Sequence, residues 1–475
     1  MSQVQHEEPL EPVYPFNPPG APIVLHSGPV CGHWEGYRNG VIELKCQPGV
    51  EVRWQIQHEA RDLSTIDRDV VTLGFERHGH QWNLDASQRS WEMTNDEITT
   101  DGWINSAKLE RTDAQLKRVL VHWMNLPRID GPIGLQYPDG LRRSSGRWRV
   151  EVDGWSITLD SRRDYRKAMK SSMREDLYLL THVMEIRRMD GDEFTASAVE
   201  RLIECLRVTL SFASGHWVAP VLPVGFDRAG EVAWERWSSP ICDRARSIGT
   251  AWLYGGHHDD ISDLITCAVP AFNDHKRPEI TRYQMILAIQ AVESGFLEQR
   301  ILAAVPALEH LAWEQLVLKG KMTSKEYEDR FAEDRLRYLL QRARIPTGID
   351  SHLPALVDYA RTHGKLDGPS AITRVRNRLI HPKTPEDQIY RHDGLVLDTW
   401  RLTLHYVTLL ILHSIGYQGS YQNPTQKGWA GDSIPVPWAG NGDFPAALPP
   451  SKAVARRSSR AGRSTRGRNR HRGSS

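Results

Sequence analysis

The residues best suited to chemistry lie in one segment, Gly368 to Pro382, which reads GPSAITRVRNRLIHP. Its opening glycine-proline pair and its closing proline predict a helix between them. At about 100° per residue, Arg376 lies close to the buried side of that helix. A guanidinium held against a core needs an anionic or hydrogen-bonding partner, and a cleft that receives phosphate would supply one. The buried side is defined by apolar residues at helical spacing: Ile372, Val375 and Leu379.

The other polar residues of this segment are expected at the solvent side and at the helix end. Arg374 and Arg378 point away from the apolar side. His381 precedes a proline, which biases it out of helical geometry, and it can project from the helix end into a cleft. A structural alternative stays open, because arginine and histidine near a helix C-terminus also complement the helix dipole.

The six residues from Arg376 to His381, RNRLIH, resemble the R-x4-H signature of the HEPN superfamily, including the frequent polar residue directly after the arginine. The context is similar too, because a helix-rich region follows a β-rich region and a long apolar helix follows the motif. Over residues 278–417 the chain resembles the larger HEPN proteins of the Apea-like, anti-phage type.

The resemblance implies a helical bundle that dimerises and acts as a metal-independent endoribonuclease. His381 would be the general acid or base for attack of an RNA 2′-OH on the adjacent phosphate. Arg376 would stabilise the developing phosphorane charge, and Asn377 would orient one of these two groups. Arg374 and Arg378 would contact the RNA. A homodimer through the helical region would bring two motifs to one cleft, and an unidentified trigger would activate the enzyme.

Other chemistries are weakly represented. In the run from His257 to Asp260, adjacent metal-ligand types point in different directions and no partner residue is evident. The stretches His78 to His80 and Cys31 to His33 are typical of turns and sheets. The sequence contains no Walker A loop and no GxGxxG after a predicted strand. We therefore predict no metal and no cofactor.

The elements that must position these residues indicate an α+β fold. Alternating apolar residues predict strands over 41–46, 50–57, 70–75 and 117–124, and a hairpin over 147–160 that turns at Asp153-Gly154. Eight of the 16 tryptophans lie in this first third and are expected in its core. The predicted regions are a disordered N-terminus (1–22), a β-rich domain (23–161), a mixed α/β connecting region (162–277), a HEPN-like helical domain (278–420), and a Pro-rich linker with an Arg-rich disordered tail (421–475).

Within these regions, several local signals are more specific. Leu177 to Arg188 fits either a strand or a helix, and Thr195 predicts the start of a helix that ends near Ala213. Gly215 to Gly256, with its prolines, is expected to be packed irregular loop. Thr323 and Glu326 form a capping box at the start of a helix that carries Leu336 and Leu339.

Charge is segregated along the chain. Residues 451–475 hold nine basic residues and no acidic one, which leaves 51 basic against 59 acidic residues before them. Such a tail suits phosphate backbones but specifies no partner by itself. No apolar run approaches the roughly 20 residues that span a bilayer, so we expect a cytoplasmic protein with RNA, and no membrane, as its partner. The tail residues expected to bind RNA are Arg456, Arg457, Arg460, Arg463, Arg466 and Arg468.

Three hypotheses follow. The first is a HEPN-type ribonuclease with a role in anti-phage defence, whose β-rich half senses a trigger or positions RNA. The second is a noncatalytic module in which the same helical region is a dimerisation or nucleotide-binding platform and the tail holds RNA. The third is a ligand-binding β-domain that the helical region only dimerises.

Overall fold

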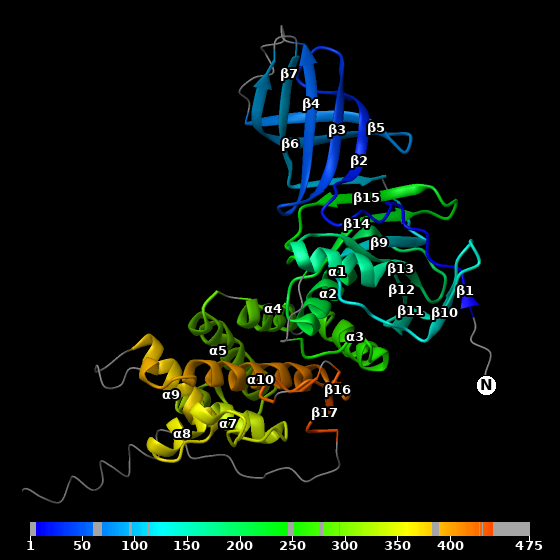
Figure 1. The fold of residues 1–475 in the computed structure, drawn as a ribbon. Helices are drawn as coiled ribbons and strands as arrows, with labels where there is room; N and C mark the ends of the chain where they lie inside the picture. Colours follow the sequence, from blue (N-terminus) through cyan, green and yellow to red (C-terminus); the bar gives the residue numbers. More distant parts are fainter. Residues whose placement is uncertain are drawn as a thin grey trace, which may run out of the picture. The chain divides into compact units, whose positions relative to one another are not determined.

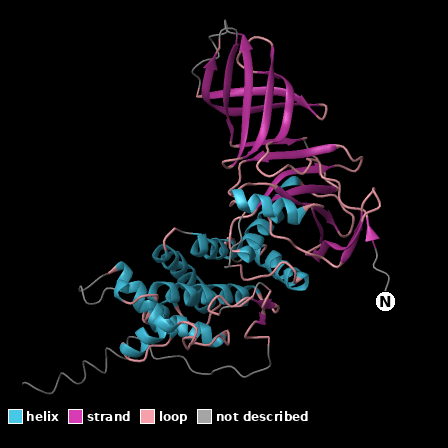
Figure 2. Cartoon of the chain, viewed as in Figure 1, coloured by secondary structure: helices cyan, strands magenta, loops and turns pink. Residues whose placement is uncertain are grey.

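The computed structural model describes residues 6–59, 69–94, 97–111, 114–245, 251–274, 279–293, 295–381, 389–426, 428–429 and 431–439. The chain separates into two compact units, unit 1 (Met1–Pro278) and unit 2 (Glu279–Ser475). Unit 1 is rich in strands and unit 2 in helices, so the chain is an α+β protein, as the sequence predicts (Figures 1 and 2).

A closed barrel forms one part of unit 1. Its strands, within the described residues, follow the order β2-β3-β4-β7-β6-β5. In β4 every second side chain is buried, including Val52 and Trp54, as the alternating sequence predicts. The strands are β2 (Ile23–Cys31), β3 (Tyr37–Cys46), β4 (Val50–Glu59), β5 (Val70–Arg77), β6 (His80–Met93) and β7 (Glu97–Ile104).

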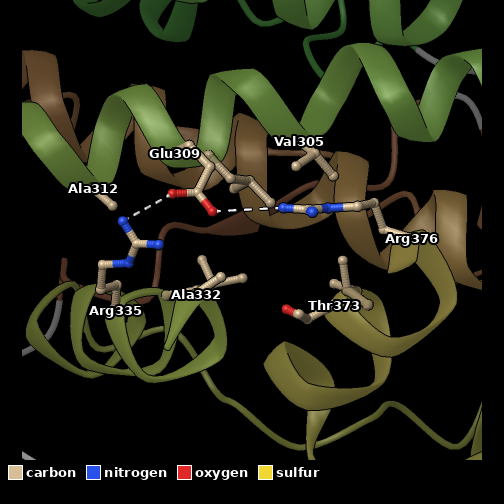
Figure 3. A pocket seen from close by; sticks show the side chains of 10 residues that line it. Val305, Glu309, Ala312, Ala332, Arg335, Thr373 and Arg376 are labelled. Atoms are coloured by element: carbon tan, nitrogen blue, oxygen red, sulfur yellow. Dashed lines mark ion pairs between the residues drawn. The ribbon is translucent and has the colours of Figure 1, made fainter. Parts of the chain in front are cut away.

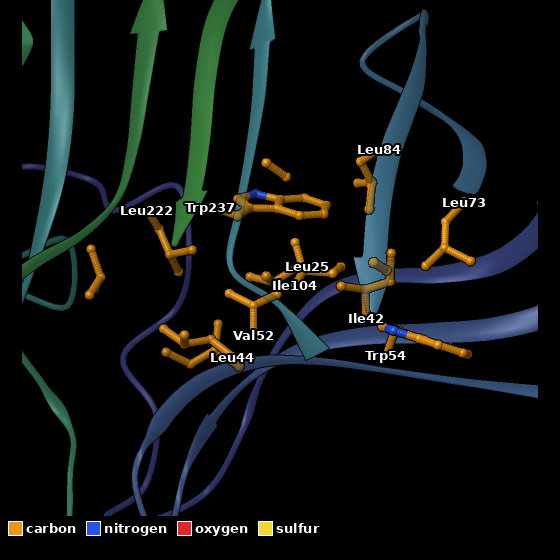
Figure 4. Packing of buried hydrophobic residues seen from close by; sticks show 14 of the residues in the cluster. Leu25, Ile42, Leu44, Val52, Trp54, Leu73, Leu84, Ile104, Leu222 and Trp237 are labelled. Atoms are coloured by element: carbon orange, nitrogen blue, oxygen red, sulfur yellow. The ribbon is translucent and has the colours of Figure 1, made fainter. Parts of the chain in front are cut away.

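Aromatic side chains fill the core of the barrel. The rings of Trp82 and Trp237 stack with centroids 4.5 Å apart, and Phe75 stacks on both of them. Trp54 lies in the same core among aliphatic side chains (Figure 4). Trp91 is 44% exposed and is an exception. The prediction that the tryptophans of the first third are mainly core residues is therefore confirmed.

A second, nine-stranded sheet occupies the rest of unit 1 in the described residues, in the order β1-β10-β11-β12-β13-β9-β14-β15-β8. It is antiparallel except where β1 pairs with β10. Helices α2 and α3 pack on it and on each other. The strands are β1 (His6–Glu7), β8 (Ser106–Glu110), β9 (Arg118–Met124), β10 (Ile133–Gln136), β11 (Arg142–Val152), β12 (Trp155–Ser161), β13 (Leu180–Arg188), β14 (Ala219–Phe226) and β15 (Val232–Ser238).

Three sequence expectations for unit 1 need correction. From residue 6 on, the segment 1–22 is part of the fold, because β1 joins the sheet and Tyr14 is 3% exposed. The expected loop at 215–256 contains β14 and β15, since a shift in register between Val221 and Val224 accommodates Pro223. The expected connecting region 162–277 supplies β13 to β15 to the same sheet as residues 106–161.

Two short-range predictions for unit 1 are confirmed, a hairpin and a helix cap. The predicted hairpin is β11 and β12, with Val152 opposite Trp155 and positive φ angles at Asp153 and Gly154. Thr195 caps helix α2 by accepting a hydrogen bond from the amide of Ala198. The helices of unit 1 are α1 (Tyr165–Glu175), α2 (Ala196–Ser214) and α3 (His258–Phe272).

Unit 2 is built from helices around α10 (Leu395–Ile415), which packs against α4, α5, α8 and α9. The predicted capping box at Thr323 is present, but the helix it opens ends at Glu328 and a second one begins at Ala332. The remaining elements are α4 (Ile280–Glu293), α5 (Leu297–Trp313), the π-helical turn Glu314–Leu318, α6 (Ser324–Glu328), α7 (Ala332–Arg342), α8 (Pro354–Thr362) and α9 (Gly368–Ile380).

The first part of the segment 421–475, which was expected to be a linker and a disordered tail, is folded. β16 (Ser420–Tyr421) pairs with β17 (Ile434–Pro435), and Val436 is buried. The side chain of Trp438 donates to the carbonyl of Tyr417 at 2.7 Å. Residues 440–475 lie outside the described residues.

Two helical segments of the described chain are long and apolar enough to cross a membrane by length and composition, Leu297–Leu318 and Leu395–Ile415. The most apolar window of Leu395–Ile415 is 83% buried inside the structure. This burial is what a central helix of a folded unit requires, because such a helix is apolar on all sides.

Candidate functional site

Helix α9, which carries the RNRLIH motif, is fixed at its N-terminal end by a charged cluster. The carboxylate of Asp367 caps the helix by accepting from the amide of Ser370 at 3.0 Å. Arg337 of α7 donates to both oxygens of that carboxylate, at 2.6 and 3.1 Å. Burial opposes the ionisation of Asp367, but the hydrogen bonds from Arg337 and Ser370 outweigh it and lower the pKa of the carboxyl. The helix start predicted at Gly368 is thus confirmed.

The glycine at this start is required by a close approach. A Cβ at Gly368 would lie 2.3 Å from the hydroxyl oxygen of Tyr406 and 3.0 Å from the carbonyl oxygen of Thr347. The same glycine donates its amide to Thr347 at 2.8 Å. Helix α9 can therefore pack this closely against α10 only with glycine at its first position.

The apolar side of α9 brings Arg376 to a carboxylate. Ile372 and Val375 are buried, as the helical spacing predicts, whereas Leu379 is only half-buried. Arg376, beside Val375, is 23% exposed. Its guanidinium pairs with Glu309 of α5, with Nη2 and Oε1 3.7 Å apart. The anionic partner that the sequence requires is thus supplied by the chain itself.

Glu309 is shared between two arginines (Figure 3). Arg335 of α7 approaches its second oxygen at 3.3 Å, and the guanidinium of Arg335 also lies over the ring of Tyr327, 4.3 Å from its centroid. The Tyr327 hydroxyl donates to the backbone carbonyl of Glu309 at 3.2 Å. One carboxylate faces two guanidinium groups, so this cluster keeps a net positive charge.

Sequence reasoning missed Glu309 and Arg335. In the sequence, both look like ordinary charged residues on the solvent side of a helix. Glu309 also precedes Arg376 by 67 positions, so no local pattern links the two. The sequence indicated only that Arg376 needs an anionic partner. It did not indicate where in the chain that partner lies.

The cavity beside these residues is small. It lies between α5, α7 and α9, with Val305, Ala332 and Thr373 among its lining residues (Figure 3). Its volume is about 20 Å³, which is room for about one water molecule. A nucleotide therefore does not fit inside it.

The other two motif residues lie at the end of α9. Asn377 is exposed, and its side-chain oxygen accepts a hydrogen bond from Nη1 of Arg376 at 3.1 Å. His381 is the exposed residue that ends the helix, and its amide donates to the carbonyl of Asn377 at 2.8 Å. In the part of the chain that the structure describes, no side chain hydrogen-bonds the imidazole of His381. The predicted stop, Pro382, lies outside the described residues.

The remaining predicted RNA contacts have mixed outcomes. Arg374 and Arg378, expected to point away from the core, are half-buried, because α5, α7, α8 and α10 pack around α9. The tail residues Arg456, Arg457, Arg460, Arg463, Arg466 and Arg468 lie outside the described residues.

No group of three or more histidine, cysteine, aspartate or glutamate side chains among the described residues is arranged to hold a metal ion. In the run from His257 to Asp260, the Asp260 carboxylate lies 3.6 Å from Nδ1 of His257 and the Asp259 carboxylate lies 3.4 Å from Nε2 of His258. The five cysteines are free thiols.

Comparisons with known proteins match the two units separately. Residues 111–248 match the family described as the YopA central domain, and residues 283–435 match the YopA C-terminal domain. The chain is 29% identical over 299 residues to the SPbeta prophage-derived uncharacterized protein YopA of Bacillus subtilis (strain 168), an alignment that covers 61% of this chain and 65% of that relative. No solved structure matches the chain. The matches thus cover residues 111–248 of unit 1 and residues 283–435 of unit 2, and the second range includes helix α9.

Proposed function

We propose that unit 2 is a HEPN-type, metal-independent endoribonuclease that acts in the cytoplasm as a homodimer, in a defence role. The observation that carries the proposal is the arrangement at the end of α9, where Arg376 and Asn377 are hydrogen-bonded to each other and His381 is exposed where the helix ends. The similarity of RNRLIH to the HEPN signature adds to it.

The proposed reaction needs only protein side chains. The imidazole of His381 removes the proton from an RNA 2′-OH, whose oxygen attacks the adjacent phosphorus while the bond to the 5′-oxygen breaks. A protonated His381 from the second copy gives a proton to the leaving oxygen, so the products are a 2′,3′-cyclic phosphate and a 5′-OH. Arg376 stabilises the charge that develops on the phosphoryl oxygens.

A second candidate function is RNA binding without cleavage. It is favoured by the ion pair between Arg376 and Glu309, which partly neutralises the charge that a phosphorane would need. It is also favoured by the absence, within the described residues, of a side chain that orients the His381 imidazole. Both candidates use the same surface and differ in whether a strand is cut.

The test is cleavage of end-labelled RNA in the presence of EDTA, with wild type compared to Arg376→Ala and His381→Ala. Loss of a general acid or base lowers the rate by about 100-fold or more. Matched controls are Arg361→Ala and His352→Ala, because both residues are exposed in the same unit, at 72% and 59%. These controls are expected to cleave at the wild-type rate.

The outcomes separate the two candidates. Cleavage by wild type and controls, but not by the two motif variants, supports the ribonuclease. Equal cleavage by every preparation overturns the assignment to α9. RNA binding by wild type without cleavage, weakened in Arg376→Ala, supports the binding module instead.

A further inference from the structure

A larger cavity lies in unit 1. The sequence did not predict that the segments lining it lie close together. Its volume is about 550 Å³, within the range of small-molecule sites. Three parts of the chain line it: the segment at Arg128, the start of β11 from Arg142 to Ser145, and the start of α1 from Arg163 to Lys167. All of them fall inside the stretch that matches the YopA central domain.

The lining is strongly cationic. Of the described residues that form it, one is acidic, Asp164, and six are basic: Arg128, Arg142, Arg143, Arg163, Arg166 and Lys167. Two of these cations are paired, because Arg128 meets Asp130 at 2.7 Å and Arg163 meets Asp139 at 2.5 Å.

The other four cations form no ion pair within the part of the chain that the structure describes; they are Arg142, Arg143, Arg166 and Lys167. Arg143 instead lies 3.4 Å from the hydroxyl of Tyr137 and 3.5 Å from that of Ser161. Four cations around one cavity repel one another, so an anion that binds among them relieves this repulsion.

Asp164, the acidic residue among the described lining residues, pairs with an arginine that does not line the cavity. Asp164 stands at the N-cap of α1, but its side chain accepts no hydrogen bond from the helix. It is instead held by the buried Arg162, whose Nε and Nη2 lie 2.6 and 3.2 Å from its two oxygens. The first turn of α1 carries no acidic residue, so the positive end of its dipole adds to the charge of the arginines.

Two arginines of the lining also act on a buried histidine. Burial, and then the positive charges of Arg128 and Arg143, lower the pKa of the fully buried His182 to about 3. Ser144 and Ser145 add hydroxyl donors to the lining. The aromatic ring among the described lining residues is Tyr165, and it is 7% exposed, so the cavity offers no stacking platform for the bases of a single strand.

We propose that this cavity binds a small ligand with two or more adjacent phosphate groups, as in a nucleoside diphosphate or triphosphate. One phosphate would leave several cations without a partner, whereas a chain of phosphates carries a negative charge for the cations of each lining segment. Arginine forks and hydroxyl groups are the side chains that hold phosphate oxygens best. This site lies in unit 1, and it holds whether or not unit 2 cleaves RNA.

The test is calorimetric titration of the full chain with tripolyphosphate, ATP, inorganic phosphate and a single-stranded RNA 12-mer. The test variant is Arg142→Ala with Arg166→Ala and Lys167→Ala, which removes three exposed cations of the lining. Its matched control, Arg174→Ala with Arg201→Ala and Arg228→Ala, removes three exposed cations of unit 1 outside the lining. Circular dichroism checks that both variants are folded.

We expect tripolyphosphate and ATP to bind one per chain, with a Kd at least about 10-fold higher in the lining variant and unchanged in the control. Inorganic phosphate binding as tightly as tripolyphosphate would overturn the requirement for adjacent phosphates. Binding of the RNA alone, lost in the lining variant, would reassign the cavity to nucleic acid. A lack of binding by all four probes would refute the proposal.

Discussion

Glu309 controls how much positive charge Arg376 presents to a ligand. In Glu309→Gln the side chain keeps its shape but no longer neutralises Arg376 and Arg335, which pair with it at 3.7 and 3.3 Å. We expect RNA to bind several-fold more tightly, while the free energy of unfolding falls by less than about 1 kcal/mol, because partly exposed pairs contribute little. Fluorescence anisotropy with labelled RNA measures the affinity.

The control for this change is Glu333→Gln, which removes an acidic charge on α7 that forms no ion pair in the described structure. An affinity gain of the same size in both variants would mean that net charge alone matters. Unchanged affinity in Glu309→Gln would mean that RNA does not contact the Arg376 guanidinium.

His122 makes the stability of unit 1 sensitive to acid. Its Nε2 accepts from the amide of Tyr14 at 3.2 Å and its Nδ1 donates to the carbonyl of Leu222 at 3.1 Å, which only a neutral ring can do. Burial lowers its pKa from 6.5 to about 4. The unfolded chain therefore binds the proton more strongly, so stability is full above pH 6.5 and is lost as pH falls towards 4, by about 3 kcal/mol.

Urea unfolding at pH 7 and pH 4.5, followed by tryptophan fluorescence, measures this loss. In His122→Gln the side chain does not titrate, so we expect lower stability at pH 7 but a smaller difference between the two pH values. The buried His182, with its pKa lowered to about 3, still contributes a difference of its own. A variant with the wild-type pH difference would exclude His122 as the titrating group.

At the scale of elements, the Arg337–Asp367 contact anchors α9 to α7. Asp367→Ala removes both the helix cap and the two-pronged ion pair. We expect the free energy of unfolding to fall by about 1 to 2 kcal/mol, the sum of a lost cap and a partly exposed pair. Thermal unfolding of the full chain measures it, with Asp358→Ala as the control, since Asp358 also pairs with an arginine but caps no helix. Equal shifts in both variants would contradict the anchoring role.

Elements whose signals are local could be predicted from the sequence. The Asp153-Gly154 turn fixed the hairpin because both positions need positive φ. Thr195, Thr323 and Pro369 marked helix starts because capping and the fixed φ of proline depend only on residues next to one another in the sequence. The alternation in β4 gave the buried face of a barrel strand.

What could not be predicted depends on partners far along the chain. The sequence of β14 contains Pro220 and Pro223 and therefore predicts a loop. The segment is nevertheless a strand, because β9 and β15 pair with it on either side. The pairing of Glu309 with Arg376 joins helices whose order in sequence says nothing about their distance. The cavity of unit 1 likewise needs three segments brought together by the sheet.

At the scale of the whole molecule, positive charge occurs at three places that differ in kind. The cavity of unit 1 is a bounded site, the surface at α9 is partly neutralised by Glu309, and residues 451–475 are a dense run of basic residues outside the described structure. The tail concentrates nine basic residues on a body whose remaining charge is negative. It is therefore expected to contribute affinity for RNA without selectivity.

Deletion of residues 451–475 tests whether the tail contributes RNA affinity separately from the cavity of unit 1. We expect weaker RNA binding and a flatter salt dependence, with the slope of log K against log salt reduced by up to about 6 for nine charges on a single strand. Binding of tripolyphosphate is expected to stay unchanged, because the cavity of unit 1 keeps all of its cations. A deletion that leaves the salt slope unchanged would show that the tail does not contact RNA, and loss of tripolyphosphate binding would place that ligand on the tail rather than in the cavity.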